Sequence, residues 1–248
     1  MKITVLAENN TRIDKYLLGE PALSLLIEYA GKTILFDTGY SDVFLKNATS
    51  LNINLDKLTD VVISHSHDDH TGGLKYLHAN KHVIFTAHPN IFDEKLDELG
   101  NSYGCPLKNT ELEKMFSLNL TQKPYYITQS IVFLGEIPNN NSSETDDSAI
   151  VCIKNDALII ITGCSHSGII NVVNYAKEVT QIKKIAAIVG GMHLLDKTMD
   201  EIEQISEFFK KENISYLAPC HCCDMNSKII LAKNNKIAEI CVGDEILF

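Results

Sequence analysis

A dense histidine motif at residues 65–70 constrains what this chain can fold into more than any other feature. The motif reads His-Ser-His-Asp-Asp-His, and four of its side chains are of types that bind metal ions: His65, His67, Asp69 and His70. The largely apolar residues 60–64 before it predict a buried strand, and residues 71–74 after it predict the turn into a helix. The motif is therefore expected in a loop at the end of a strand.

The spacing within this motif suggests two neighbouring metal ions. His65 and His67 share one face, because side chains alternate along an extended segment, whereas Asp69 and His70 follow on the turn and can face a second ion. The alternative is a surface loop that is rich in histidine without binding metal, and it explains so dense a cluster less well.

Length and composition predict one domain over residues 1–248. The chain is 45% hydrophobic and 22% charged, so it can bury a large core. Its formal net charge of −10 disfavours binding to nucleic acid or to an anionic membrane, so a small anionic substrate must be held locally. No apolar stretch has the length of a secretory signal or a membrane span, and a cytoplasmic protein is expected. The oligomeric state is left open.

The cysteines argue against a disulfide framework. The sequence has 7 of them, an odd number, and its one Cys-x-x-Cys spacing, at 220–223, has no second to pair with. Reduced thiols in a cytosol fit this pattern better.

Apolar runs bounded by turn residues predict strands along most of the chain. They lie at residues 2–6, 23–29, 33–36, 61–63, 83–86, 131–134, 149–153, 158–162, 185–189, 215–217 and 237–242. Helical spacing of apolar residues predicts surface helices over 169–176 and 199–209, and the polar residues 138–147 predict an exposed loop. Two sheets packed face to face with helices outside account for this order, with strand-end loops converging on one edge.

Two further histidines complete a set of three protein ligands for each of two metals. His166 lies between the predicted strand 158–162 and the helix that follows it, and His221 follows another short strand. A structural role remains the alternative for each, but the histidine motif favours ligation.

The remaining histidines receive other roles. His193 also follows a strand but exceeds the number of ligands required, so we assign it to substrate contact or proton transfer, with a core or supporting role as the alternative. We expect Asp69 and His193 to be the catalytic residues. His78, His82 and His88 have no comparable setting and are predicted to be surface or boundary residues.

Asp37 ends the predicted strand 33–36. A carboxylate at this position can orient a metal-binding histidine through the second nitrogen of its ring. The alternative is that Asp37 only caps a turn in the segment Asp-Thr-Gly.

Taken together, the strand-end motif, Asp37 and the later histidines resemble the metallo-β-lactamase superfamily over nearly the whole chain. The resemblance implies an α/β fold, a four-layer αββα sandwich, with a binuclear site at one edge. It also implies two sets of ligands: His65, His67 and His166 on one metal, and Asp69, His70 and His221 on the other.

Three segments look like one branch of this superfamily. They read Gly-Cys-Ser-His-Ser-Gly-Ile-Ile-Asn at 163–171, Gly-Gly-Met-His-Leu at 190–194 and Pro-Cys-His-Cys at 219–222. The branch is often labelled dihydropterin ribofuranosylaminobenzene phosphate synthase, a step of methanopterin synthesis. It also contains many proteins described only as metal-dependent hydrolases.

Cys164 departs from the superfamily pattern. Many hydrolases of the superfamily carry Gly-Asp at the comparable place, with the carboxylate bridging the metals, whereas this chain has Gly163 followed by Cys164. Three interpretations stay open: Cys164 ligates as a thiolate, which favours zinc; solvent hydroxide bridges the metals alone; or Cys164 is a small packed residue.

The leading hypothesis for the activity is metal-dependent hydrolysis. Two divalent metals, expected to be zinc, lower the pKa of a bound water, and the resulting hydroxide attacks an ester or phosphoester of a small anionic metabolite. The helix that begins near Ser167 is expected to offer its N-terminal amides to a phosphate.

Four alternatives remain. The first is a synthase that condenses a pterin pyrophosphate with an aryl ribosyl phosphate, and the second is a metal-dependent binding module without turnover. The third is di-iron oxygen chemistry, which is disfavoured because Asp69 stands where that branch usually has Glu and the chain lacks the length for a flavin-binding module. The fourth is a Cys164 nucleophile with His166 as its base, which the spacing disfavours.

Overall fold

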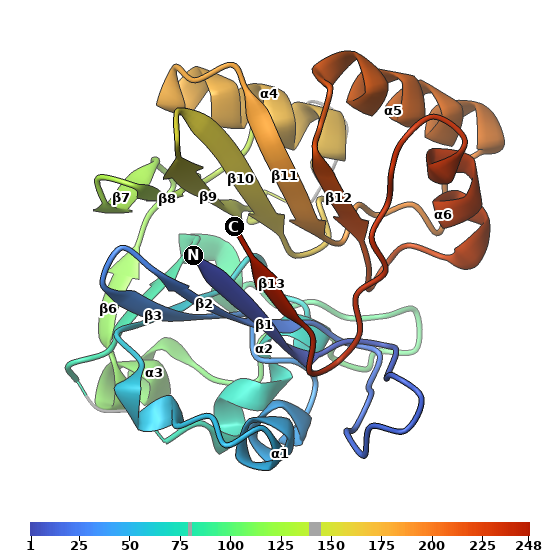
Figure 1. Ribbon diagram of the computed structural model, residues 1–248. Coiled ribbons are helices and arrows are strands. Elements are labelled where there is room, and N and C mark those ends of the chain that lie inside the picture. Colours follow the sequence, from blue (N-terminus) through green and yellow to red (C-terminus); the bar gives the residue numbers. More distant parts are fainter. Residues whose placement is uncertain (79–80, 139–144) are drawn as a thin grey trace. The chain divides into compact units, whose positions relative to one another are not determined.

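The computed structural model describes residues 1–78, 81–138 and 145–248. They form two compact units: unit 1 comprises residues 1–122 and 241–248, and unit 2 comprises residues 123–240. Each unit consists of a mixed β-sheet with helices on one of its faces (Figure 1). That the chain folds as a single domain stays a prediction.

The sheet of unit 1 has the strand order β13-β1-β2-β3-β4-β5-β6. The bounds are β1 Lys2–Ala7, β2 Ser24–Tyr29, β3 Lys32–Phe36, β4 Asp60–Val62, β5 Ile84–Ala87, β6 Ser117–Leu120 and β13 Glu245–Leu247. Strands β2 and β3 are antiparallel and joined by Ala30 and Gly31, both at positive φ, as a tight two-residue hairpin turn requires. From β3 to β6 the strands are parallel, so their carboxyl ends share one edge.

Short helices cover one face of this sheet. They are α1 Val43–Ser50, α2 Asp68–Thr71 and α3 Asn109–Met115, with 3₁₀ turns η1 Leu55–Lys57, η2 Gly72–Tyr76 and η3 Pro89–Phe92. Their apolar side chains, among them Phe44, Leu74 and Leu112, pack in one buried cluster with Leu35 and Phe85 of the sheet. Burial of this face holds the helices, which are too short to be stable alone.

The sheet of unit 2 has the strand order β12-β11-β10-β9-β8-β7. The bounds are β7 Tyr125–Thr128, β8 Ile131–Phe133, β9 Ala149–Lys154, β10 Ala157–Thr162, β11 Ile185–Gly190 and β12 Tyr216–Pro219. Strands β10, β11 and β12 are parallel and are connected through α4 Ile169–Thr180 and α5 Met199–Glu212, and α6 Met225–Ala232 follows β12. The loops that leave these three strands therefore lie at one edge of the sheet.

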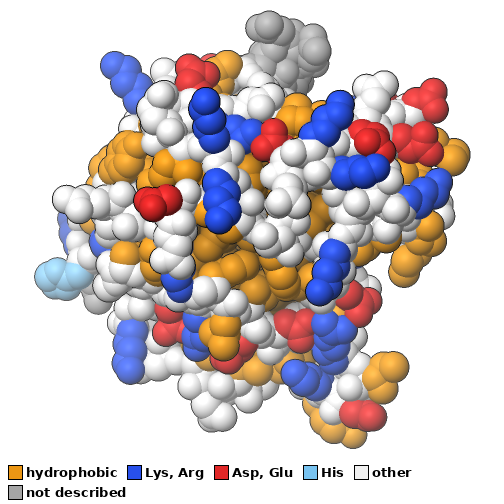
Figure 2. Space-filling model, turned by 45° about the horizontal axis from the view of Figure 1, so that its top comes forward, with side chains coloured by type: hydrophobic (Ala, Val, Ile, Leu, Met, Phe, Trp, Pro, Cys, Tyr) orange, Lys and Arg blue, Asp and Glu red, His pale blue; other side chains and the backbone are white. Residues whose placement is uncertain are grey.

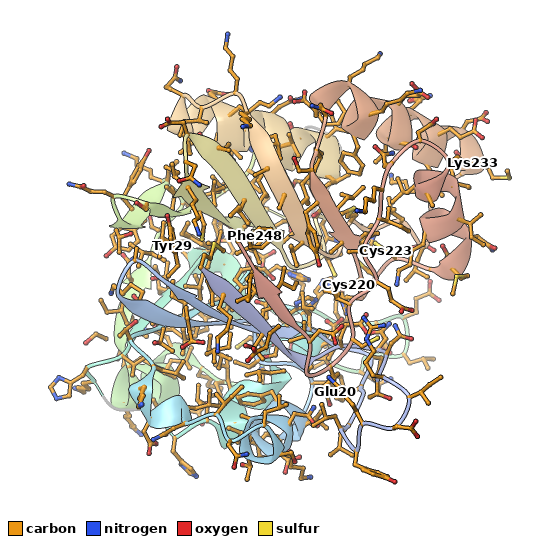
Figure 3. The ribbon with its side chains drawn as sticks, viewed as in Figure 1. Glu20, Tyr29, Cys220, Cys223, Lys233 and Phe248 are labelled. Atoms are coloured by element: carbon orange, nitrogen blue, oxygen red, sulfur yellow. The ribbon has the colours of Figure 1, made fainter. Side chains whose placement is uncertain are left out.

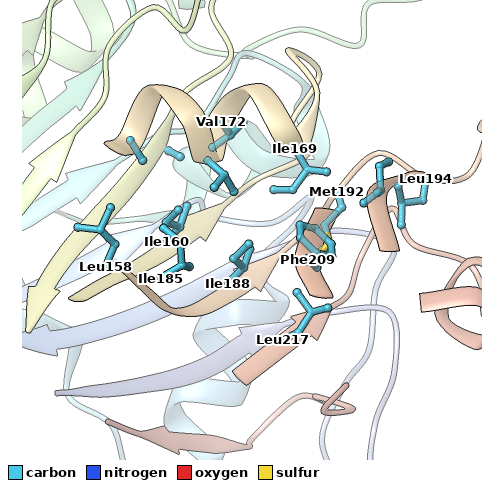
Figure 4. Close-up of a cluster of buried hydrophobic side chains, with 14 of the residues drawn as sticks. Leu158, Ile160, Ile169, Val172, Ile185, Ile188, Met192, Leu194, Phe209 and Leu217 are labelled. Atoms are coloured by element: carbon cyan, nitrogen blue, oxygen red, sulfur yellow. The ribbon is translucent and has the colours of Figure 1, made fainter. Parts of the chain in front are cut away.

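The apolar faces of α4 and α5 hold them on this sheet. Val172 of α4 and Phe209 of α5 pack with Ile160 and Ile188 of the sheet in one buried cluster (Figure 4). Helix α5 begins at a capping box, in which the carboxylate of Glu201 accepts the backbone N–H of Thr198 at 2.8 Å.

The structure confirms most of the strands and both helices that the sequence predicts, and it corrects two segments. Residues 237–242 form no regular strand, because Ile237 pairs singly with Leu217 while Val242 pairs singly with Thr11. Residues 139–144 of the predicted exposed loop 138–147 lie outside the described residues. Its end is buried rather than exposed, with both Asp146 and Asp147 only 1% accessible.

The described surface carries mixed charge. Figure 2 shows a face on which basic and acidic side chains are interspersed, so no broad field of one sign covers it. Among the described residues, no helix is long and apolar enough to cross a membrane.

Candidate metal centre

The histidine motif lies where the sequence predicts it, in the loop after β4 and in the short helix α2. The ring centroid of His65 is 4.6 Å from that of His67 and 4.2 Å from that of His70. Asp69 Oδ2 lies 3.6 Å from His70 Nε2. Unit 1 therefore brings all four motif residues together.

Asp37 contacts His70 directly and His65 through Ser64, which is the arrangement that its predicted orienting role requires. Its Oδ2 lies 2.7 Å from His70 Nδ1 and accepts the hydroxyl of Ser64 at 2.8 Å, while its Oδ1 accepts the backbone N–H of Ser64 at 2.7 Å. The Ser64 hydroxyl in turn lies 2.9 Å from His65 Nδ1. With both Nδ1 atoms held in this way, Nε2 is the nitrogen that His65 and His70 present to a metal.

Two glycines let the loop after β4 pack against the end of β3. A Cβ at Gly72 would lie 2.2 Å from the carbonyl oxygen of Tyr40, and a Cβ at Gly73 would lie 2.0 Å from that of Thr38. At the same contact, the Thr38 N–H donates to the carbonyl of His70 at 2.7 Å. The pair of glycines that follows the motif is thus required by close backbone packing.

In unit 2, the three predicted strand-end histidines lie on three neighbouring loops. His166 follows β10, His193 follows β11 and His221 follows β12. The rings of His166 and His193 are in contact, with centroids 4.4 Å apart. Nδ1 of His193 is buried without a hydrogen-bond partner among the described residues.

His221 belongs to a second group, with Cys164 and Cys222. One ligand atom from each of these three side chains lies within 4.8 Å of the others. The backbone N–H of His193 donates to Cys222 Sγ at 3.2 Å, and contact with Cys222 raises the pKa of the His193 ring. Hydrogen bonding, first with Cys164, holds the pKa of Cys222 well below the usual value for a thiol.

The sequence reasoning missed Cys222, although the run Cys-His-Cys-Cys at 220–223 was a visible signal. The loop that carries it follows β12, as the labelled Cys220 and Cys223 in Figure 3 show. No disulfide joins cysteines among the described residues.

Backbone hydrogen bonds join the three loops of unit 2 around Gly190 and Gly191. The Cys220 N–H donates to the carbonyl of Gly190 at 3.1 Å, and the Gly191 N–H donates to that of Gly163 at 2.9 Å. A Cβ at Gly191 would lie 2.2 Å from the Gly163 oxygen and 2.6 Å from Cys222 Sγ. The Gly-Gly pair is therefore required for the cysteines and histidines to approach.

Gly191→Ala is expected to destabilise the protein by about 1–3 kcal/mol, because the added methyl group overpacks the junction of the loops. Urea unfolding measures this change. Gly104→Ala is the control, since its Cβ would come no closer than 3.2 Å to the side chain of Lys95. Equal stability of the two variants would contradict the close packing described for Gly191.

The structure corrects the predicted phosphate site near Ser167. Helix α4 begins at Ile169, and both the N–H and the hydroxyl of Ser167 donate to Oδ2 of Asp147. Burial raises the pKa of this carboxyl group to about 6. The helix thus starts two residues later than expected, and an acidic side chain already takes the amide of Ser167.

The other histidines are only partly as predicted. His78 and His82 are exposed, as expected. His88 is 1% accessible and its Nδ1 accepts the Asn90 N–H at 3.1 Å, so its assignment to the surface or boundary was wrong. It is buried because it caps η3 at the end of β5.

This chain belongs to the metallo-β-lactamase superfamily, whose model matches residues 18–137. A Methanocaldococcus jannaschii protein named 7,8-dihydropterin-6-methyl-4-(beta-D-ribofuranosyl)-aminobenzene-5'-phosphate synthase is 30% identical to it, over 90% of this chain and 87% of its own. An uncharacterized protein of the same organism is 32% identical, over 95% and 96% of the two chains. These relatives confirm the resemblance that the sequence motifs indicated.

A solved structure has the same fold. Tm1679, described as a metal-dependent hydrolase of the β-lactamase superfamily, superposes with a TM-score of 0.87 at 29% identity, over 100% of this chain and 99% of the other. The predicted fold class, the α/β fold of the metallo-β-lactamases, is therefore confirmed.

The donor groups fit the divalent metals, such as zinc, that this superfamily typically binds. Imidazole nitrogens and a carboxylate are ligands that zinc accepts. In unit 1, Nδ1 of His70 faces Asp37 and Nδ1 of His65 faces Ser64. Nε2 of each ring is the nitrogen left for a metal. His, Cys and Asp clusters of this kind make the chain a candidate metal-binding protein.

Proposed function

We propose that this chain is a metal-dependent hydrolase that cleaves an ester or phosphoester of a small anionic metabolite. Two divalent metal ions, zinc by preference, are held by the six ligands that the family resemblance implies: His65, His67 and His166 on one, and Asp69, His70 and His221 on the other. The observation that carries the proposal is the orientation of the motif, in which Asp37 and Ser64 fix one nitrogen of His70 and His65 and leave Nε2 for a metal.

The metals supply Lewis acidity, which activates water near neutral pH without a protein nucleophile. The side chains around them do the positioning. Asp69 holds a metal and its carboxylate faces His70, and His193 contacts the substrate or transfers a proton. The ring contact between His193 and His166, and the buried Nδ1 of His193, support that role.

The proposal specifies a small anionic substrate and a cytoplasmic protein. The positive charge of two metal ions attracts an anionic group even though the chain as a whole carries a formal net charge of −10. Cysteines that form no disulfide among the described residues fit a reducing compartment. Tm1679, which carries the name of a metal-dependent hydrolase, supports the reaction class.

A panel of phosphoesters, esters and lactones tests the proposal, using protein loaded with zinc and protein stripped with a chelator. Turnover is expected only with metal and is expected to vanish in the double variant His65→Ala/His70→Ala. His193→Ala should keep its metal and lose turnover. Hydrolysis by the stripped protein or by the double variant would remove the basis for the proposed mechanism.

The second candidate function is a synthase, which the 30% identical Methanocaldococcus jannaschii relative supports. Such an enzyme would join a pterin pyrophosphate to an aryl ribosyl phosphate through a new carbon–nitrogen bond, and pyrophosphate would leave. Incubation of the zinc-loaded protein with both compounds distinguishes the two functions. A condensed product favours the synthase, whereas release of phosphate or alcohol without it favours the hydrolase.

A further inference from the structure

Unit 2 brings together three side chains of types that bind metal ions, a combination that the sequence analysis did not predict. Cys164 follows β10, while His221 and Cys222 follow β12. One ligand atom of each lies within 4.8 Å of the other two, and the side chains are buried, with 4%, 8% and 7% of the three residues accessible. Two thiols and one imidazole thus face one small volume.

We propose that Cys164 and Cys222 are thiolate ligands of the same metal that His221 binds. The inference rests on the proposed function, in which His221 is a ligand. It selects one of the interpretations that the sequence left open for Cys164 and adds a second sulfur ligand. A mixed sulfur and nitrogen donor set favours zinc or another soft metal over magnesium or calcium.

The residues around Cys222 stabilise negative charge on its sulfur atom and leave space for that atom. The backbone N–H of His193 donates to Cys222 Sγ at 3.2 Å. Gly191 leaves room for that sulfur, because a Cβ there would come within 2.6 Å of it. A small residue packed only for its volume requires neither a donor aimed at its sulfur nor a glycine opposite it.

The backbone conformation of His221 also supports this inference. Its φ is +55°, a left-handed conformation that residues other than glycine rarely adopt. Strain of this kind clusters at functional sites. The neighbouring residue Cys222 is fixed as well, because its carbonyl accepts the N–H of Leu194 at 3.1 Å. The loop is therefore held in a conformation that keeps His221 and Cys222 beside Cys164.

X-ray absorption at the zinc edge of the full zinc-loaded protein tests this inference without an activity assay. Zinc–sulfur distances are about 2.3 Å, whereas zinc–nitrogen distances are about 2.0–2.1 Å. Wild-type protein with two zinc ions should show about one sulfur per zinc on average, because one ion binds both thiolates and the other binds none. Cys164→Ser and Cys222→Ser should each halve this signal, and the double variant should abolish it.

Cys220→Ser is the matched control, because Cys220 is buried in the same loop but lies outside the group of three. It should keep the full sulfur signal. A wild-type spectrum without sulfur, at two bound zinc ions, would overturn this inference and leave the hydrolase proposal standing. A sulfur signal that persists in the double variant would overturn it too. Failure to bind zinc at all would overturn both proposals.

Discussion

His70→Ala is expected to reduce the bound metal from two ions per chain to one and to abolish turnover. His70 is fully buried, its Nδ1 is held by Asp37 at 2.7 Å, and its Nε2 lies 3.6 Å from Asp69 Oδ2. Alanine removes Nε2, the ring nitrogen of His70 that Asp37 does not hold. Asp69 then loses the neighbouring side chain that is proposed to bind the same metal. The loss of activity should exceed the roughly 10–100-fold that removal of a supporting hydrogen bond costs.

Elemental analysis of wild type and variant, together with the substrate panel, measures both effects. His88→Ala is the matched control, because His88 is also a buried histidine at the end of a parallel strand of unit 1. It should keep both metals and full activity. Two metals retained by His70→Ala would show that His70 is not a ligand and would remove it from the six proposed ligands.

The histidine motif could be predicted because its geometry is local. Its histidines follow one another closely in the chain, so their spacing after β4 is enough to bring His65, His67 and His70 together in the structure. Asp37 was predictable for a related reason, since an acid at the end of one parallel strand lies beside the loop of the next. In both cases the sequence pattern and the strand direction carry the information.

The neighbours of Cys222 and the burial of Asp147 could not be predicted from the local sequence. The neighbours of Cys222 come from three loops, and their approach depends on the order of β10, β11 and β12 and on close packing at Gly191. Asp147 stands at the end of a polar stretch that local composition predicts to be exposed. It is buried because Ser167, 20 residues further on, donates two hydrogen bonds to it.

The strands of the fold also divide into those that the local sequence predicts and those that it does not. Strands that are buried along their length, such as β10, appear as continuous apolar runs and were predicted. The edge strands β6 and β7 are half-buried or exposed along their length and carry no such run, so hydrophobicity predicted neither of them. Residues 237–242 are an apolar run whose ends pair singly with different partners, which hydrophobicity alone does not reveal.

Asp37→Asn is expected to lower metal affinity by about 10–100-fold while the fold persists, because the amide has nearly the shape of the carboxylate. Asp37 Oδ1 accepts the Ser64 N–H, so an asparagine oxygen would take that place and its NH₂ group would face His70 Nδ1. An NH₂ donor requires Nδ1 to be the acceptor, and a neutral imidazole then carries its proton on Nε2. In that tautomer Nε2 has no lone pair for a metal, so the variant would weaken the site through the orientation of a proton rather than through loss of a ligand.

Metal titration of the purified variant measures this change, and His70→Ala gives the reference for complete loss of the ligand. Asp60→Asn is the matched control. Asp60 is another buried carboxylate of unit 1, at the opposite end of β4, and its Oδ2 pairs with Lys32 at 2.9 Å. That substitution should cost stability without changing metal affinity, because no ring nitrogen depends on it. An Asp37→Asn protein that binds metal as tightly as wild type would mean that His70 keeps its tautomer without the carboxylate, and the orienting role of Asp37 would then have to be abandoned.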